Sequence, residues 1–198
     1  MSSTTCAPAM MLDERKWAGL LIFVGAAQFV IGVMLAEALY PGYHVGDRFI
    51  SDLGVGPSAA IFNVSVIFLG LFVLAGAYVA RKVFGLILTI LIVLTGVGAI
   101  GVGVFTENAG ILHTIFSLIT FLFGGVTAVW AARLLKPPLS YISAIMGAIG
   151  LVALGLFISG VFLGLGQGGM ERMIAYPIIA WAIAFGGYLM TSPEPALG

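Results

Sequence analysis

The sequence predicts an all-α fold, a polytopic transmembrane bundle of about six helices. Hydrophobic residues make up 61% of the chain and charged residues only 8%, whereas soluble domains carry roughly 25% charged residues. Apolar runs of about 20 residues, enough for a helix to cross the hydrocarbon of a bilayer, recur along the chain. These runs are continuous, which excludes the period-two alternation of a membrane β-barrel.

Polar breaks separate six hydrophobic segments, and the connectors are short apart from residues 40–57. We expect one transmembrane domain over residues 17–190, between terminal tails at 1–16 and 191–198. The predicted spans are 17–39, 58–80, 83–104, 111–134, 139–163 and 171–190.

Basic residues near the span ends predict the orientation. One side carries six of them, whereas the other carries only Arg48 and Arg172. Because cytoplasmic loops are enriched in Lys and Arg, we expect a multi-pass protein of the cell membrane with both termini cytoplasmic. The connectors at residues 40–57, 105–110 and 164–170 then face outward.

Charge and cysteine content restrict the partners and cofactors. Eight basic and eight acidic residues leave no net charge, so nothing indicates nucleic acid, and the expected partner is membrane lipid. The single cysteine, Cys6, excludes an intramolecular disulfide and a cysteine-rich metal site. A divalent metal is possible, although no specific motif indicates one.

Small residues recur at helical spacing and predict close helix packing, since lipid provides no hydrophobic drive for helix association. Such faces could also support a homo-oligomer. The residues are Gly32 and Ala36, then Gly96, Ala99 and Gly103, then Gly160 and Gly164.

Most polar chemistry lies on the side opposite the termini. Five of the eight acids and both histidines are found there, with the two outward basic residues. Ionisable groups inside a membrane are costly and indicate function. We therefore predict that six side chains converge into one partly buried site at this boundary: Glu37, Asp52, Glu107, His113, Glu171 and Arg172.

His113 begins a polar stripe about one turn into the fourth predicted span. Ser117, Thr120, Gly124 and Thr127 follow at helical spacing, and we expect this face to point into the bundle. His113 could titrate or bind a metal, or it could simply be a buried histidine hydrogen-bonded to a neighbouring helix.

The other polar residues each allow two interpretations. Glu107 could orient His113 or share a metal with it, or it could cap the following helix. Asp52 could be a site ligand or a turn former. Arg172, at the start of the sixth predicted span, could lie at the interface or pair with Glu37, Glu107 or Asp52.

The chain also resembles the family catalogued as domain of unknown function 998, six-span membrane proteins common in prokaryotes. The resemblance rests on short motifs in order: 40–43 (YPGY), 50–54 (ISDLG), 62–63 (FN), 103–107 (GVFTE), His113, 168–172 (GGMER) and 176–177 (YP). It covers nearly the whole chain from the first span onward, with Thr106 standing where the family usually has proline. It implies a shared fold and a shared outward site, but no activity.

Three classes of function remain open: an intramembrane hydrolase acting on lipid or lipid-linked substrate, a small-solute transporter, and a structural or sensory protein. The candidate catalytic residues are Glu107, His113 and Asp52, as acid, base or metal ligands. The candidate substrate-binding residues are Glu37, Glu171, Arg172 and Tyr43. The apolar cytoplasmic halves of the spans argue against an ion path.

Overall fold

The computed structural model describes residues 13–191, which form six long helices and contain no strand. All six are long and apolar enough to cross a membrane, as the sequence predicts. Cys6 and the outer parts of both predicted tails lie outside the described residues. The helices are α1 (Glu14–Ala38), α2 (Ala59–Val79), α3 (Arg81–Val104), α4 (Ile111–Ala131), α5 (Leu139–Ile158) and α6 (Gly166–Thr191).

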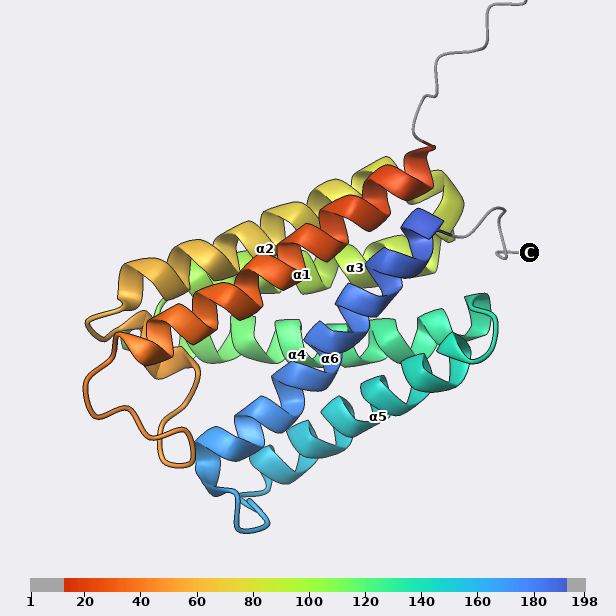
Figure 1. Ribbon diagram of the computed structural model, residues 1–198. Helices are drawn as coiled ribbons and strands as arrows, with labels where there is room; N and C mark the ends of the chain where they lie inside the picture. Colours follow the sequence, from red (N-terminus) through yellow and green to blue (C-terminus); the bar gives the residue numbers. More distant parts are fainter. Residues whose placement is uncertain (1–12, 192–198) are drawn as a thin grey trace, which may run out of the picture.

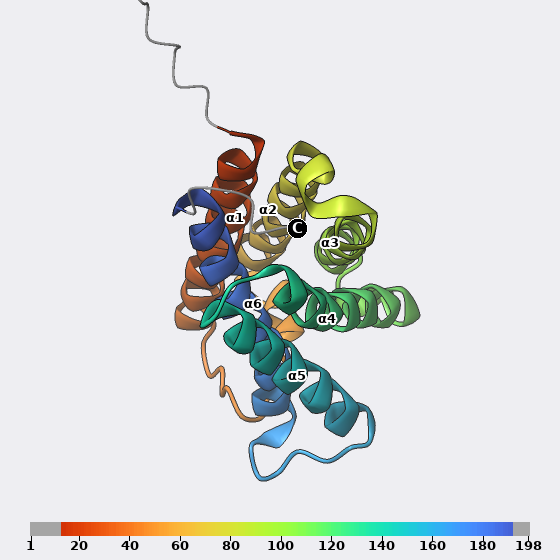
Figure 2. The same cartoon turned by 90° about the vertical axis from the view of Figure 1, so that its right-hand side faces the viewer.

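The bundle is a ring in which each helix packs against its neighbours in sequence, and α6 closes the ring against α1. Figure 1 shows α6 running obliquely across the bundle, and Figure 2 shows α1, α2 and α3 grouped beside α4 and α5. The start of α1 and the end of α6 meet at one end, where Gly19 and Gly186 allow their backbones to approach closely. We call this the terminal end.

The opposite end, which we call the long-loop end, carries the connector between α1 and α2 (Figure 1). This connector includes the short 3₁₀ helix η1 (Ser51–Gly54). A second short 3₁₀ helix, η2 (Glu107–Ala109), joins α3 to α4 and contacts η1. Two segments far apart in sequence are thereby brought together above the bundle.

The fifth and sixth spans differ from the predicted boundaries. Helix α5 ends at Ile158, and the two glycines expected to pack, Gly160 and Gly164, lie in the connector with φ of +71° and +79°. A Cβ atom added to either glycine would have no neighbour within 4 Å. Their spacing therefore reflects left-handed turns, and the prediction of close packing there was wrong.

Glycines form the contact between α2 and α3. A Cβ atom on Gly70 would lie 2.5 Å from the carbonyl oxygen of Gly96, and one on Gly103 would lie 2.8 Å from that of Asn63. The expected packing of this face is therefore confirmed at both glycines. Ala99, between them, is buried and lines an internal cavity instead.

Candidate functional site

Arg172 joins helix α6 to helix α1 and to the long connector. Its Nη2 donates to Glu37 Oε1 at 2.5 Å and to the Tyr43 hydroxyl at 2.7 Å. Its Nη1 donates to three backbone carbonyls, of Val45, Arg48 and Gly168, at 2.9–3.2 Å. The Arg172 side chain is only 6% exposed, so one buried guanidinium holds the connector against the bundle. Of the acids considered for Arg172, Glu37 is its ion-pair partner.

Tyr43 links Arg172 to a further part of the connector through its hydroxyl group. Its hydroxyl accepts from Arg172 and donates to the carbonyl of Phe49 at 2.6 Å. Burial of the ring raises the pKa of Tyr43 to about 12, although the hydrogen bond from Arg172 opposes the rise. Tyr43 is therefore neutral at physiological pH and acts as a hydrogen-bond relay.

Glu171 is buried, not at the helix start as the sequence suggested, because α6 begins five residues earlier at Gly166. Its Oε2 accepts from the backbone N–H of Ile50 at 2.5 Å. Gly168 makes this approach possible, since a Cβ atom there would collide with the carbonyls of Arg48 and Val45. Within the motif at 168–172, Gly168 thus leaves space for the connector, and the side chains of Glu171 and Arg172 hydrogen-bond to its backbone.

Three carboxyl groups, those of Asp52, Glu107 and Glu171, interact at the long-loop end. Asp52 accepts from the backbone N–H of Phe49 at 3.1 Å, and its carboxyl group meets that of Glu107 in a side-chain hydrogen bond. Both carboxyl groups also act electrostatically on Glu171. Burial, followed by the bond and charge of Asp52, raises the pKa of Glu107 from 4.5 to about 7. Near neutral pH, therefore, the Glu107 carboxyl group is protonated for part of the time.

Glu107 therefore meets neither of the partners that its sequence position suggests. Helix α4 has no side-chain cap, since Gly110 stands at its N-cap. His113 is buried, with Nδ1 2.8 Å from the carbonyl oxygen of Phe105 and Nε2 3.2 Å from Ser117 Oγ. These are the local hydrogen bonds of a structural histidine, and neither joins it to an acid. Among residues 13–191, no group of three or more His, Cys, Asp and Glu side chains could hold a metal ion.

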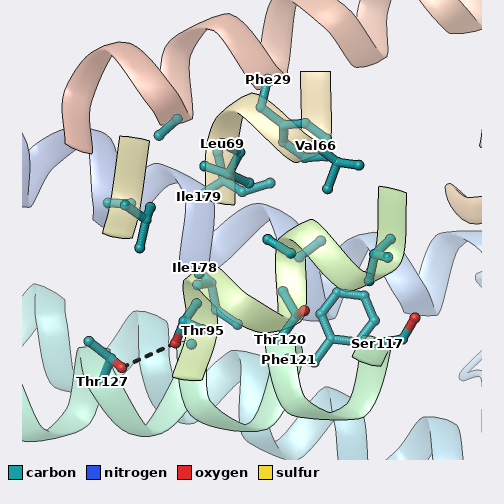
Figure 3. A pocket seen from close by; sticks show the side chains of 18 of the residues that line it. Phe29, Val66, Leu69, Thr95, Ser117, Thr120, Phe121, Thr127, Ile178 and Ile179 are labelled. Carbon is teal, nitrogen blue, oxygen red and sulfur yellow. Dashed lines mark hydrogen bonds between the residues drawn. The ribbon is translucent and has the colours of Figure 1, made fainter. Parts of the chain in front are cut away.

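An elongated cavity of about 120 Å³ lies inside the bundle, below the carboxyl groups. Its lining runs from Glu171 to Phe185 on α6, fourteen residues or about 21 Å of helix. Ile50, Ser51 and Glu171 line its long-loop end, which we call the mouth. Apolar side chains make up most of the wall, and Figure 3 shows Phe29, Val66 and Leu69 facing Phe121 across the space.

The polar stripe of α4 faces this cavity, as its spacing predicted. Ser117, Thr120, Gly124 and Thr127 all contribute to the wall. The hydroxyls of Thr120 and Thr127 donate to carbonyls one turn back in their own helix, at 2.8 Å and 2.5 Å. Thr127 also lies 3.5 Å from Thr95 of α3 (Figure 3). These hydroxyls are internally satisfied, so the wall behaves as a largely apolar surface.

Sequence reasoning did not find several residues of the cavity. Trp181 lines its deeper part and is 5% exposed, and its buried indole N–H has no hydrogen-bond partner. Phe29 and Ile179 line it from α1 and α6. They are ordinary apolar residues within spans, so no sequence signal separates them from lipid-facing neighbours.

The predicted site residues thus fall into three groups. Arg172, Glu37 and Tyr43 form one connected cluster, and Asp52, Glu107 and Glu171 form a second, of which Glu171 lines the mouth. His113 stands apart, with hydrogen bonds to neither group.

The resemblance noted in the sequence is supported by comparison with protein families. The profile of the family described as protein of unknown function DUF998 matches residues 23–188, which include every helix from α2 to α5 and most of α1 and α6. The chain belongs to this family. It is an integral membrane protein of the family, with six helices suited to span a bilayer. No curated protein and no solved structure matches the chain.

Proposed function

We propose that this protein binds a membrane lipid, holding part of its hydrocarbon chain in the central cavity and its polar group at the mouth. The observation that carries the proposal is an internal cavity with an apolar wall and a buried carboxyl group, Glu171, at one end. An engineered apolar cavity of about 150 Å³ accepts benzene, so a cavity of about 120 Å³ offers room for several methylene groups.

The charges around the mouth indicate the kind of polar group. Glu171 lines the mouth, and the carboxyl groups of Asp52 and Glu107 act on it electrostatically, whereas the guanidinium of Arg172 is already engaged by Glu37. An anionic head group would be repelled, while hydroxyl or amine groups could donate hydrogen bonds to the carboxylates. The ligand class is therefore a neutral or cationic lipid with donor groups on its head.

The orientation belongs to the same proposal. Cytoplasmic termini and a mouth on the outer side are supported by the six-to-two asymmetry of basic residues. In a Cys6→Ser background, a membrane-impermeant thiol reagent should label Asp47→Cys in intact cells and not Lys82→Cys. The reverse pattern would invert the orientation.

Fluorescence of Trp181 provides the test of lipid binding. Replacing Trp17 and Trp130 with phenylalanine leaves Trp181, which lines the cavity, as the sole tryptophan. Brominated monostearoylglycerol should quench Trp181 at lower concentration than brominated stearic acid, which has the same chain and an anionic head. Equal quenching by both would refute the selectivity, and absence of quenching would refute the binding.

A cavity-filling variant distinguishes a chain inside the bundle from lipid at its surface. Ala99→Leu adds three carbons to the wall of the cavity and should reduce the quenching. Val97→Leu is the matched control, since Val97 is exposed on the same helix and should leave quenching unchanged.

A second candidate function, hydrolysis of a lipid or lipid-linked substrate, is favoured by the Asp52–Glu107 pair. Two neighbouring carboxyl groups can act as acid and base on either side of a water molecule, as in aspartic proteases, and the pKa of Glu107 near 7 suits the role of the acid. The proposal predicts that Asp52→Asn and Glu107→Gln each abolish turnover of a monoacylglycerol while quenching of Trp181 remains. Absence of turnover by the unmodified protein would leave binding alone.

A small-solute transporter receives less support. The deeper part of the cavity is lined by Ile22, Val73, Ile92, Trp181 and Phe185, an apolar wall that would not solvate a polar solute. The polar groups are concentrated at the mouth, which suits an amphipathic ligand better.

A further inference from the structure

A second hollow lies beside the cavity, on the outer surface of the bundle between α1 and α6. It is a groove of about 310 Å³ lined by Phe29, Val30, Val33, Met34, Tyr176, Ile179, Ala180 and Ile183. All eight belong to helices that can span a membrane, and seven are apolar. The medium around such helices is lipid, so the groove is open to hydrocarbon.

Two side chains separate this groove from the cavity. Phe29 and Ile179 line both hollows, and they are 6% and 9% exposed. These two side chains are therefore part of the wall that the groove and the cavity share. We call the pair the partition.

The surroundings of the partition suit a gate. About two turns further toward the long-loop end, Arg172 and Glu37 tie α6 to α1 by their ion pair. At the level of the groove the two walls meet through apolar side chains. Pro177 lies inside α6 beside the groove and cannot supply the backbone N–H of a helical hydrogen bond, which makes this turn of α6 easier to deform.

The mouth offers a poorer route for a hydrocarbon chain. The connector above it is fixed to α6 through Arg172 and Glu171, and a chain entering there must first pass through water at a cost for each methylene. A lateral route keeps the chain in an apolar medium throughout.

We propose that the α1–α6 groove is a lateral portal through which the hydrocarbon chain of a membrane lipid passes from the bilayer into the central cavity, past Phe29 and Ile179. This inference rests on the proposed lipid binding, since a portal needs a cavity that accepts a chain. It adds the route of entry and the residues that control it.

The test uses the protein with Trp181 as sole tryptophan, reconstituted in phosphatidylcholine vesicles. Brominated monostearoylglycerol is added and the rate of quenching is followed. Ala180→Phe places a ring in the groove from an exposed position, whereas Ala184→Phe places the same ring one turn along α6, exposed but outside both hollows. Ala99→Leu, with its cavity filled, measures quenching by lipid at the bundle surface.

Quenching from inside the cavity is the part that Ala99→Leu removes. Ala180→Phe should make this part slower by about tenfold or more, equivalent to a barrier at least about 1.4 kcal/mol higher. Ala184→Phe should retain the reference rate, and Ile179→Val, which shortens one side of the partition, should quench faster. Equal rates for both phenylalanine variants would overturn the portal while leaving lipid binding intact. If the reference protein shows no quenching beyond that of Ala99→Leu, the lipid-binding proposal itself fails.

Discussion

The hydrogen bonds of Arg172 predict that this residue contributes more to stability than other polar residues at the long-loop end. Arg172→Met keeps much of the side-chain length and removes the charge and its donors. The change leaves the Glu37 carboxylate and the Val45 carbonyl without their donor, and leaves the Arg48 carbonyl with a 3.5 Å contact from the Tyr43 hydroxyl. Removing one partner of a buried ion pair costs roughly 3–5 kcal/mol. Because the Glu37 side chain is 22% exposed and can be rehydrated, we expect about 3 kcal/mol, at the lower end of that range.

A double-mutant cycle separates the ion pair from the other bonds. Glu37→Gln retains a hydrogen-bond acceptor and should cost about 1.5–2 kcal/mol, as for one bond to a charged group. The double variant should be less destabilised than the sum of the single variants by about 1–2 kcal/mol, because each single change already removes the pair.

Reversible unfolding in mixed detergent micelles would give these free energies. Arg48→Gln is the control, since the Arg48 side chain is exposed and makes its hydrogen bond and cation–π contact with Tyr40, while its carbonyl stays available to Arg172. It should change stability by no more than about 0.5 kcal/mol. If Arg172→Met is no more destabilising than Arg48→Gln, the anchoring role of Arg172 is refuted. Strict additivity in the cycle would refute the Arg172–Glu37 coupling.

Two further predictions concern the carboxyl pair and the glycine contact. Because the folded state raises the pKa of Glu107 from 4.5 to about 7, it binds the proton more tightly than the unfolded chain, so stability should fall as pH rises from about 4.5 through 7. Screening at this partly exposed residue limits the loss to on the order of 1 kcal/mol. The unfolding free energy, measured across this pH range, should depend less steeply on pH in Glu107→Gln. An unchanged dependence would contradict the raised pKa of Glu107. Gly96→Leu should destabilise the bundle by roughly 1–3 kcal/mol, whereas Ala99→Leu should cost less than about 1 kcal/mol because it extends into the cavity; equal melting temperatures for the two variants would contradict this difference.

The correct predictions from the sequence depend on patterns among residues that are close together in the chain. Continuous apolar runs predicted six spans, and four-residue spacing predicted that Ser117 to Thr127 face inward. Helix α6 began earlier than expected because residues 166–170 are mostly glycine and carry little apolar signal. Gly160 and Gly164 showed helical spacing by coincidence, and only their positive φ angles reveal their role in turns.

The partners of the polar residues depended on the fold. Glu107 lies six residues from His113 in the sequence, yet its carboxyl group meets that of Asp52, 55 residues away, because η1 and η2 pack together. Trp181 and Thr95 likewise line the cavity because of how α6 and α3 pack in the bundle. A single sequence contains the charges of a site, but the choice among several possible partners is made by the packing of its helices.

The hydrogen bonds of Glu171 and Arg172 also determine when the site can form during synthesis. A nascent chain emerges N-terminus first, and α6 is the last of the six helices to be made. Until it inserts, Glu37 lacks its cation, the connector lacks its anchor, and the side of the bundle between α1 and α5 is open to lipid. Insertion of the final helix is therefore the step that pairs Glu37, anchors the connector and closes the bundle between α1 and α5.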